Sequence, residues 1–144
     1  MPLLLLDVLP ATALLSASGF GLGLCITCIL HLTDLRDDRI NSTKFVQRVT
    51  LMHPVEFGCH ALSIAVMLRA SSLLLAGINL PLLGLRGMWS WKGLLNVSVA
   101  ESTGEELQSD LLVRYLMMAA WHAMSVLLAV SILVFNFVFS LSEG

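Results

Sequence analysis

The stretch LMHPVEFGCHALSIAVMLRASSLLLAGINLPLLGLRGM, residues 51–88, decides the fold, because it is apolar for almost twice the width of a membrane. As one α-helix its ~38 residues would extend ~57 Å, whereas the hydrocarbon core of a bilayer is about 30 Å thick. Two short membrane-spanning helices, at about residues 54–68 and 72–85, use this length better. Arg69 then falls at the turn between them, where its side chain reaches the headgroups.

Apolar segments without charged residues lie on both sides of this hairpin. No Asp, Glu, Lys or Arg occurs in residues 8–33 or in residues 115–142, and each segment is longer than the ~20 residues that cross a bilayer as a helix. We expect spans at about residues 8–32 and 111–141. The sequence therefore predicts an all-α, polytopic membrane protein with four transmembrane helices in a single domain, residues 1–144.

The composition supports a membrane protein and excludes other classes. Hydrophobic residues make up 57% of the chain and charged residues 12%, with a mean hydropathy of +0.87, whereas soluble domains carry about 25% charged residues. A net charge of −2 without a basic run gives no indication of nucleic-acid binding. The three cysteines lie in apolar segments, which argues against a disulfide framework. Because the N-terminus lacks a basic n-region, we interpret the first apolar segment as a retained span.

Basic residues predict the orientation. With four spans and both termini lumenal or extracellular, the connecting loops at about residues 33–53 and 86–110 face the cytoplasm. Only Arg69 of the eight Lys and Arg residues then lies outside, in agreement with the positive-inside rule, whereas three spans would divide them almost evenly. The N-glycosylation patterns at Asn41 and Asn96 are therefore expected to stay unmodified, since glycan is added on the lumenal side.

Two features interrupt the apolar spans with small or helix-disturbing residues. Gly19 and Gly23 form a GxxxG pair, which lets another helix approach closely. We interpret this pair as packing within the protein's own bundle, with a docking face for another protein's span as the alternative. Pro81 has no N–H to donate, so we expect it to kink or end the helix. Asn79 is expected to satisfy the freed backbone or to bond a neighbouring helix.

His53, Glu56 and His60 are spaced three and four residues apart and so share one helical face. This pattern raises the hypothesis of a metal site, with His31 or His122 as a further ligand. Against it, Pro54 is expected in the first helical turn, which places His53 at or before the cap. No second acidic residue lies within a span. We therefore expect no metal and no cofactor, and we expect Glu56 and His60 to pair locally near the cytoplasmic interface.

The sequence gives no indication of catalysis. Cys25 and Cys28 form a CxxC within an apolar helix without a second pair, which is typical of buried small side chains. We find no pattern that would assemble a nucleophile, a base and an oxyanion site. The chain is predicted not to be an enzyme.

The order of these motifs resembles the cornichon family of eukaryotic cargo receptors, whose members carry D-L, P-E-x-x-x-H and L-N-x-P-L-L segments in that order. Here Asp34-Leu35 opens a charged loop, Pro54 and Glu56 are followed by His60, and INLPLL occupies residues 78–83. The resemblance extends over most of the chain and is strongest at about residues 33–85.

Three departures identify the chain as a divergent member. Val55 separates Pro54 from Glu56, and Asn41-Ser42 replaces the family's Asn-Pro. The second loop has NVSV at residues 96–99 in place of Tyr-Asp-Pro-Thr.

The resemblance implies a receptor in the endoplasmic reticulum membrane that recognises membrane-spanning cargo within the bilayer. It also implies linkage to the COPII coat and cycling to the Golgi, so the expected partners are transmembrane cargo, coat components and lipids, and no nucleic acid. The alternatives are an auxiliary subunit of a channel or transporter and, less favoured, a membrane metalloenzyme. Candidate residues for cargo binding or bundle packing are Glu56, His60, Asn79, Pro81, Gly19 and Gly23.

Overall fold

The structure, a computed structural model, describes residues 2–70, 72–93, 95, 97–99 and 101–142, with the backbone alone for residues 2–7, and this part of the chain contains helices joined by short connections and no strands. Four of these helices are long and apolar enough to cross a membrane. The predicted fold class is thereby confirmed. The helices are α1 (Pro2–Arg36), α2 (Ser42–Arg69), α3 (Leu73–Trp91) and α4 (Glu105–Ser142), with a short 3₁₀-helix, η1 (Glu101–Thr103), before the last.

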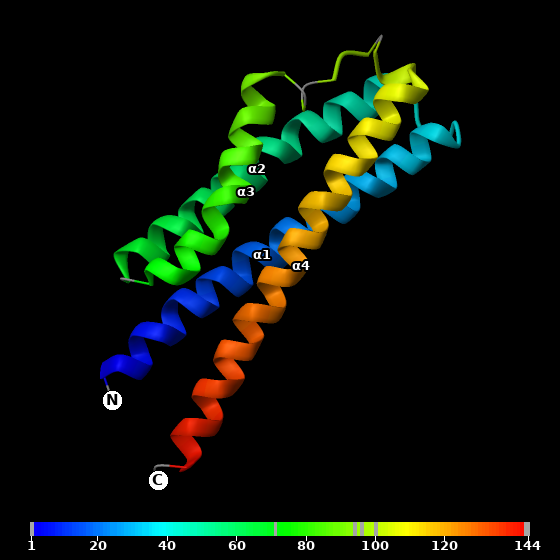
Figure 1. Cartoon of the computed structure of the whole chain (residues 1–144). Coiled ribbons are helices and arrows are strands. Elements are labelled where there is room, and N and C mark those ends of the chain that lie inside the picture. The colour runs from blue at the N-terminus through cyan, green and yellow to red at the C-terminus, as the bar shows by residue number, and fades with distance from the viewer. Residues whose placement is uncertain (1, 71, 94, 96, 100, 143–144) are drawn as a thin grey trace.

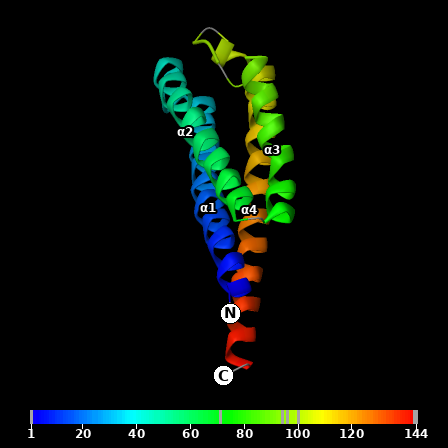
Figure 2. The same cartoon turned by 90° about the vertical axis from the view of Figure 1, so that its left-hand side faces the viewer.

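Helices α1 and α4 form the longest contact of the bundle and run side by side (Figures 1 and 2). Both bury residues at alternating steps of three and four, which is the heptad spacing of coiled-coil packing. The buried positions are Ala11, Leu14, Ser18, Gly21, Cys25, Cys28, Leu32 and Leu35 in α1, and Gln108, Leu111, Tyr115, Met118, His122, Ser125 and Ala129 in α4.

Helices α2 and α3 form a hairpin that is shorter than the α1–α4 pair. Helix α2 packs against α1, whereas α3 packs mainly against α2 and lies at the outside of the bundle (Figure 2). The two termini lie at the same end of the molecule, together with the α2–α3 turn, and the two longer connections lie at the other end (Figure 1). An even number of passes along the bundle produces this arrangement.

The α2 helix begins twelve residues before the expected start of its span at Pro54. Asn41 is its N-cap, and the Oδ1 atom of Asn41 accepts a hydrogen bond of 2.9 Å from the Lys44 backbone N–H. The expectation that Pro54 occupies the first turn and His53 the cap was wrong. A proline removes only one backbone hydrogen bond, and packing against neighbouring helices compensates for it within a bundle.

The α3 helix also extends further than expected, to Trp91, and it continues through Pro81. Arg86, which the sequence analysis assigned to a cytoplasmic loop, is therefore a helical residue and is 1% exposed. The expected loop position was wrong, because an arginine beside an apolar segment ordinarily marks the end of a span whereas Arg86 is paired inside the bundle. Which part of each helix lies within the membrane remains a prediction.

The connection between α3 and α4 is partly packed into the bundle. Leu95 and Val97 are buried in the same apolar cluster as Trp89. The Ser98 hydroxyl and backbone N–H donate to the Glu101 carboxylate at 2.7 and 3.2 Å, and these bonds hold the pKa of Glu101 below its usual range. Asn96, the second predicted glycosylation acceptor, lies outside the described residues.

Candidate functional site

A buried carboxylate, that of Glu56 in α2, lies where all four long helices meet. Glu56 is 3% exposed, and its partner Arg86 in α3 is 1% exposed. The Arg86 Nη2 group donates to Glu56 Oε2 at 2.9 Å, and Nη1 pairs with Oε1. This two-pronged pairing is the strong geometry for an arginine and a carboxylate. It gives the interior of the bundle an ion pair with no net charge.

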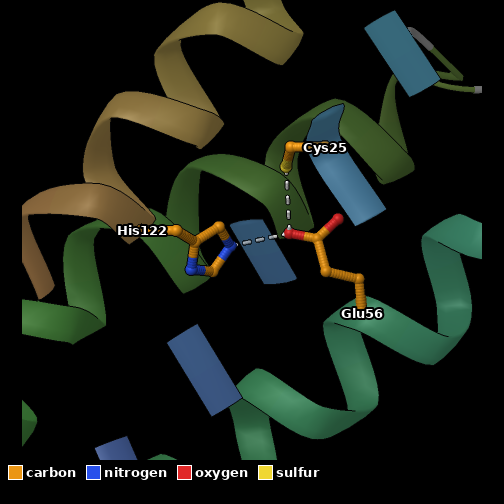
Figure 3. Close-up of side chains that lie close together, drawn as sticks. All are labelled: Cys25, Glu56 and His122. Atoms are coloured by element: carbon orange, nitrogen blue, oxygen red, sulfur yellow. Dashed lines mark hydrogen bonds and ion pairs between the residues drawn. The ribbon is translucent and has the colours of Figure 1, made fainter. Parts of the chain in front are cut away.

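The same carboxylate binds side chains from α1 and α4 (Figure 3). Glu56 Oε1 accepts hydrogen bonds from His122 Nε2 at 2.8 Å and from the Cys25 thiol at 3.7 Å. Because an ionised carboxylate only accepts, His122 Nε2 carries the proton of this bond. Among the described residues, His122 Nδ1 has no hydrogen-bond partner. Glu56 therefore connects its own helix to the other three.

A second set of hydrogen bonds is centred on Asn79 in α3. His60 Nε2 donates to the Asn79 backbone carbonyl at 3.2 Å, and the Ser125 hydroxyl of α4 donates to Asn79 Oδ1 at 3.1 Å. The Asn79 amide nitrogen donates to the Leu75 carbonyl of its own helix at 2.9 Å. Asn79 thus bonds a neighbouring helix, which was one of the two roles expected for it.

Glu56 and His60 do not pair with each other, contrary to expectation. Each bonds α3 at a different point, Glu56 at Arg86 and His60 at Asn79. The His60 and His122 rings lie nearly perpendicular to each other, with centroids 5.5 Å apart. His53 completes the polar interior by a 3.2 Å hydrogen bond to the Tyr115 hydroxyl.

The glycine that permits close packing is not the one that the GxxxG pattern indicated. Gly19 and Gly23 are exposed, and an added Cβ on either would meet nothing within 4 Å. At Gly21 an added Cβ would lie 2.7 Å from the imidazole ring of His122. Gly21 is therefore the residue that admits His122 to the interior. The expectation that Gly19 and Gly23 pack within the bundle was wrong, because these residues lie on the opposite face of α1.

The ligand atoms of Cys25, Glu56 and His122 lie within 4.8 Å of one another, which is close enough to test as a metal site. Two observations disfavour it. The Arg86 guanidinium contacts both carboxylate oxygens, so a metal ion would lie beside a fixed positive charge. A histidine ligand also needs a partner for its other ring nitrogen, and His122 Nδ1 has none among the described residues. The geometry suits one ion pair and a set of hydrogen bonds.

Two members of this polar interior, Arg86 and Ser125, were not considered for a site from the sequence. Cys25 was expected to be a buried small side chain, which it is, and His122 was named only as a possible metal ligand. Arg86 carried a usable signal, since it follows Asn79 by seven residues and so lies on the same face of the helix. Ser125 carried only its heptad spacing. Pro81, a sequence candidate, lies on the exposed face of α3 and is not part of this interior.

Comparison with known proteins gives one match. A family model described as Cornichon protein matches residues 11–102. No curated protein and no solved structure matches the chain.

Proposed function

This chain belongs to the cornichon family, and we propose from that premise that it is a receptor that recognises membrane-spanning cargo and links it to the COPII coat. Cornichon proteins are membrane proteins of the secretory pathway with a general role as adaptors in export from the endoplasmic reticulum. The proposal adds recognition within the bilayer, coat linkage and cycling to the Golgi. The family match over residues 11–102 is the observation that carries it.

The distribution of residues supports recognition by the helices. Outside the four long helices, the described chain forms only short connections and one 3₁₀ turn, which offer little surface for a soluble ligand. Gly19 and Gly23 face outward with free space over both, and small residues let a foreign helix approach closely in lipid. We place the cargo contact on this face of α1.

The charge distribution supports lumenal termini. Of the eight Lys and Arg residues, Arg69 lies at the end that carries the termini, and Arg86 is buried in its ion pair. The remaining six lie toward the end with the two longer connections, which by the positive-inside rule is the cytoplasmic end. The coat-binding surface is proposed at this end.

Affinity purification in mild detergent tests the proposal. The wild-type protein is expected to retain coat components and several membrane proteins. Gly19→Leu and Gly23→Leu are expected to lose the membrane proteins at unchanged protein level, because a large side chain blocks the approach of another helix. Gly58→Leu on α2 is the matched control, since Gly58 also has nothing within 4 Å of an added Cβ. A single constant partner would instead indicate an auxiliary subunit, and unchanged cargo with all three variants would contradict the proposed surface.

A further inference from the structure

The α3 helix is attached unequally to its two neighbours. Toward α2 it has the Arg86–Glu56 ion pair and the hydrogen bond from His60 to the Asn79 carbonyl. Toward α4, the described side chains give one hydrogen bond, from Ser125 to Asn79 Oδ1. The polar contacts of α3 with α2 are therefore stronger than its polar contacts with α4.

An apolar groove of about 540 Å³ lies along that boundary. Ser125 both lines this groove and donates the hydrogen bond across it. The side chains of α3 and α4 therefore do not interdigitate fully at this level, and the seam lacks the close packing that fixes α1 against α4. Its lining residues are Ile78 of α3 and Met117, Ala120, Trp121, Met124, Ser125 and Leu128 of α4.

The sequence of α3 is also that of a helix with little stability of its own. It contains Gly77, Gly84 and Gly87, and none of them has an atom within 4 Å of an added Cβ, so close packing does not require glycine there. Each glycine weakens a helix relative to alanine. The N-cap Ser72 makes no side-chain capping bond. Few packed contacts and weak local structure are the physical marks of a segment that moves.

We propose that the seam between α3 and α4 is a lateral gate, in which α3 stays bound to α2 and separates from α4 when the Ser125–Asn79 hydrogen bond breaks. Such a bond between membrane helices shifts an equilibrium by about threefold on average. Losing it would raise the ratio of the open to the closed arrangement by about the same factor. The gate does not rest on cargo binding, and its test involves no cargo.

Distances between spin labels measure the gate directly in lipid nanodiscs. Labels at Leu80→Cys in α3 and Leu127→Cys in α4 lie on exposed positions outside the groove. Cys59→Ser removes the half-buried native thiol, whereas Cys25 and Cys28 are buried. The wild-type protein is expected to show a shorter and a longer distance. Raising the temperature should increase the fraction of molecules that show the longer distance.

Substitutions of Ser125 test whether its hydrogen bond to Asn79 holds the gate closed. Ser125→Ala is expected to raise the ratio of longer to shorter distances by about threefold, and Ser125→Thr, which keeps the hydroxyl, is expected to leave it unchanged. Ser131→Ala is the matched control on the same helix, because the Ser131 hydroxyl bonds only its own helix, at the Leu127 carbonyl.

A second label pair, Ile26→Cys and Leu116→Cys, reports on the α1–α4 contact and should give one distance in every variant. A single wild-type distance between α3 and α4 at all temperatures would overturn the gate, and this holds even where Ser125→Ala fails to accumulate. The gate would also be overturned if the distance distribution between α1 and α4 broadened as much as the one between α3 and α4, because such a result would show that the whole bundle loosens.

Discussion

Replacing Arg86 with methionine is expected to lower the free energy of unfolding by about 3–5 kcal/mol, the usual cost of removing one partner from a buried ion pair. The structure explains why the cost should reach this range. Glu56 is 3% exposed, so its carboxylate would stay in the bundle with only the His122 and Cys25 hydrogen bonds and without a cation. Arg86→Met keeps the apolar length of the side chain, and the loss is therefore electrostatic.

Removing both charges should recover most of this loss. The double variant Glu56→Gln with Arg86→Met contains no buried charge, and its amide oxygen still accepts from His122. The double variant still lacks the hydrogen bonds to the guanidinium, and each such bond contributes about 0.6–1.7 kcal/mol in a membrane bundle. We therefore expect the double variant to be more stable than Arg86→Met alone.

Tryptophan fluorescence during titration of detergent-solubilised protein with a denaturing detergent measures these stabilities, because Trp89 lies in the apolar core. Arg39→Met is the control. Arg39 pairs with Asp34 and Asp37 at the surface and has a side chain that is 69% exposed, so its loss should cost about 0–1 kcal/mol. The reasoning would be refuted by an Arg86→Met variant within 1 kcal/mol of wild type, or by a double variant no more stable than it.

Three further expectations follow from the structure and the proposed topology. Gly21→Ala should cost about 1–3 kcal/mol by overpacking against His122, whereas Gly23→Ala, with free space around it, should be tolerated; the same titration compares them. Endoglycosidase treatment should leave gel mobility unchanged for the acceptors at Asn41 and Asn96 but change it for an acceptor appended to the C-terminus, and modification at either native site would contradict the four-span orientation. Protein purified without chelators should contain no stoichiometric zinc or iron by elemental analysis, and bound metal that is lost on replacing His122 would show that the Cys–Glu–His group is a metal site after all.

Much of the fold was accessible from sequence because a membrane imposes strong constraints on it. Charge-free segments longer than a bilayer crossing predicted two of the helices, and the excess length of residues 51–88 predicted the hairpin. Helix ends were less accessible. A helix that leaves the membrane continues as long as its backbone is capped and packed, so Asn41 and Trp91 gave no hydropathy signal.

The polar interior could be predicted only in part. Glu56, His60 and Asn79 stood out because polar side chains within apolar segments are costly unless they are paired. Their pairing with Arg86 and His122 did not stand out, since these two residues are 30 and 66 residues from Glu56 in sequence and no local pattern connects them to it. The spacing of seven residues from Asn79 places Arg86 on the same face of the helix, but the packing of the helices is needed to show that it is buried against Glu56.

The pairing of α1 with α4 also fixes the order in which the molecule can be completed. Of the four helices, α1 is synthesised first and α4 last. The face of α1 with Ser18, Gly21 and Cys25 therefore has no α4 to pack against during most of synthesis. The α2–α3 hairpin arrives in between and can join its own charges, Glu56 to Arg86, before the chain is finished. Chains that stop before Glu105 would thus have a neutralised hairpin beside a first helix that still lacks its main neighbour. Such unfinished chains leave the α4-facing surface of α1 without its partner, and a stop codon before Glu105 should therefore lower the steady-state level of the protein.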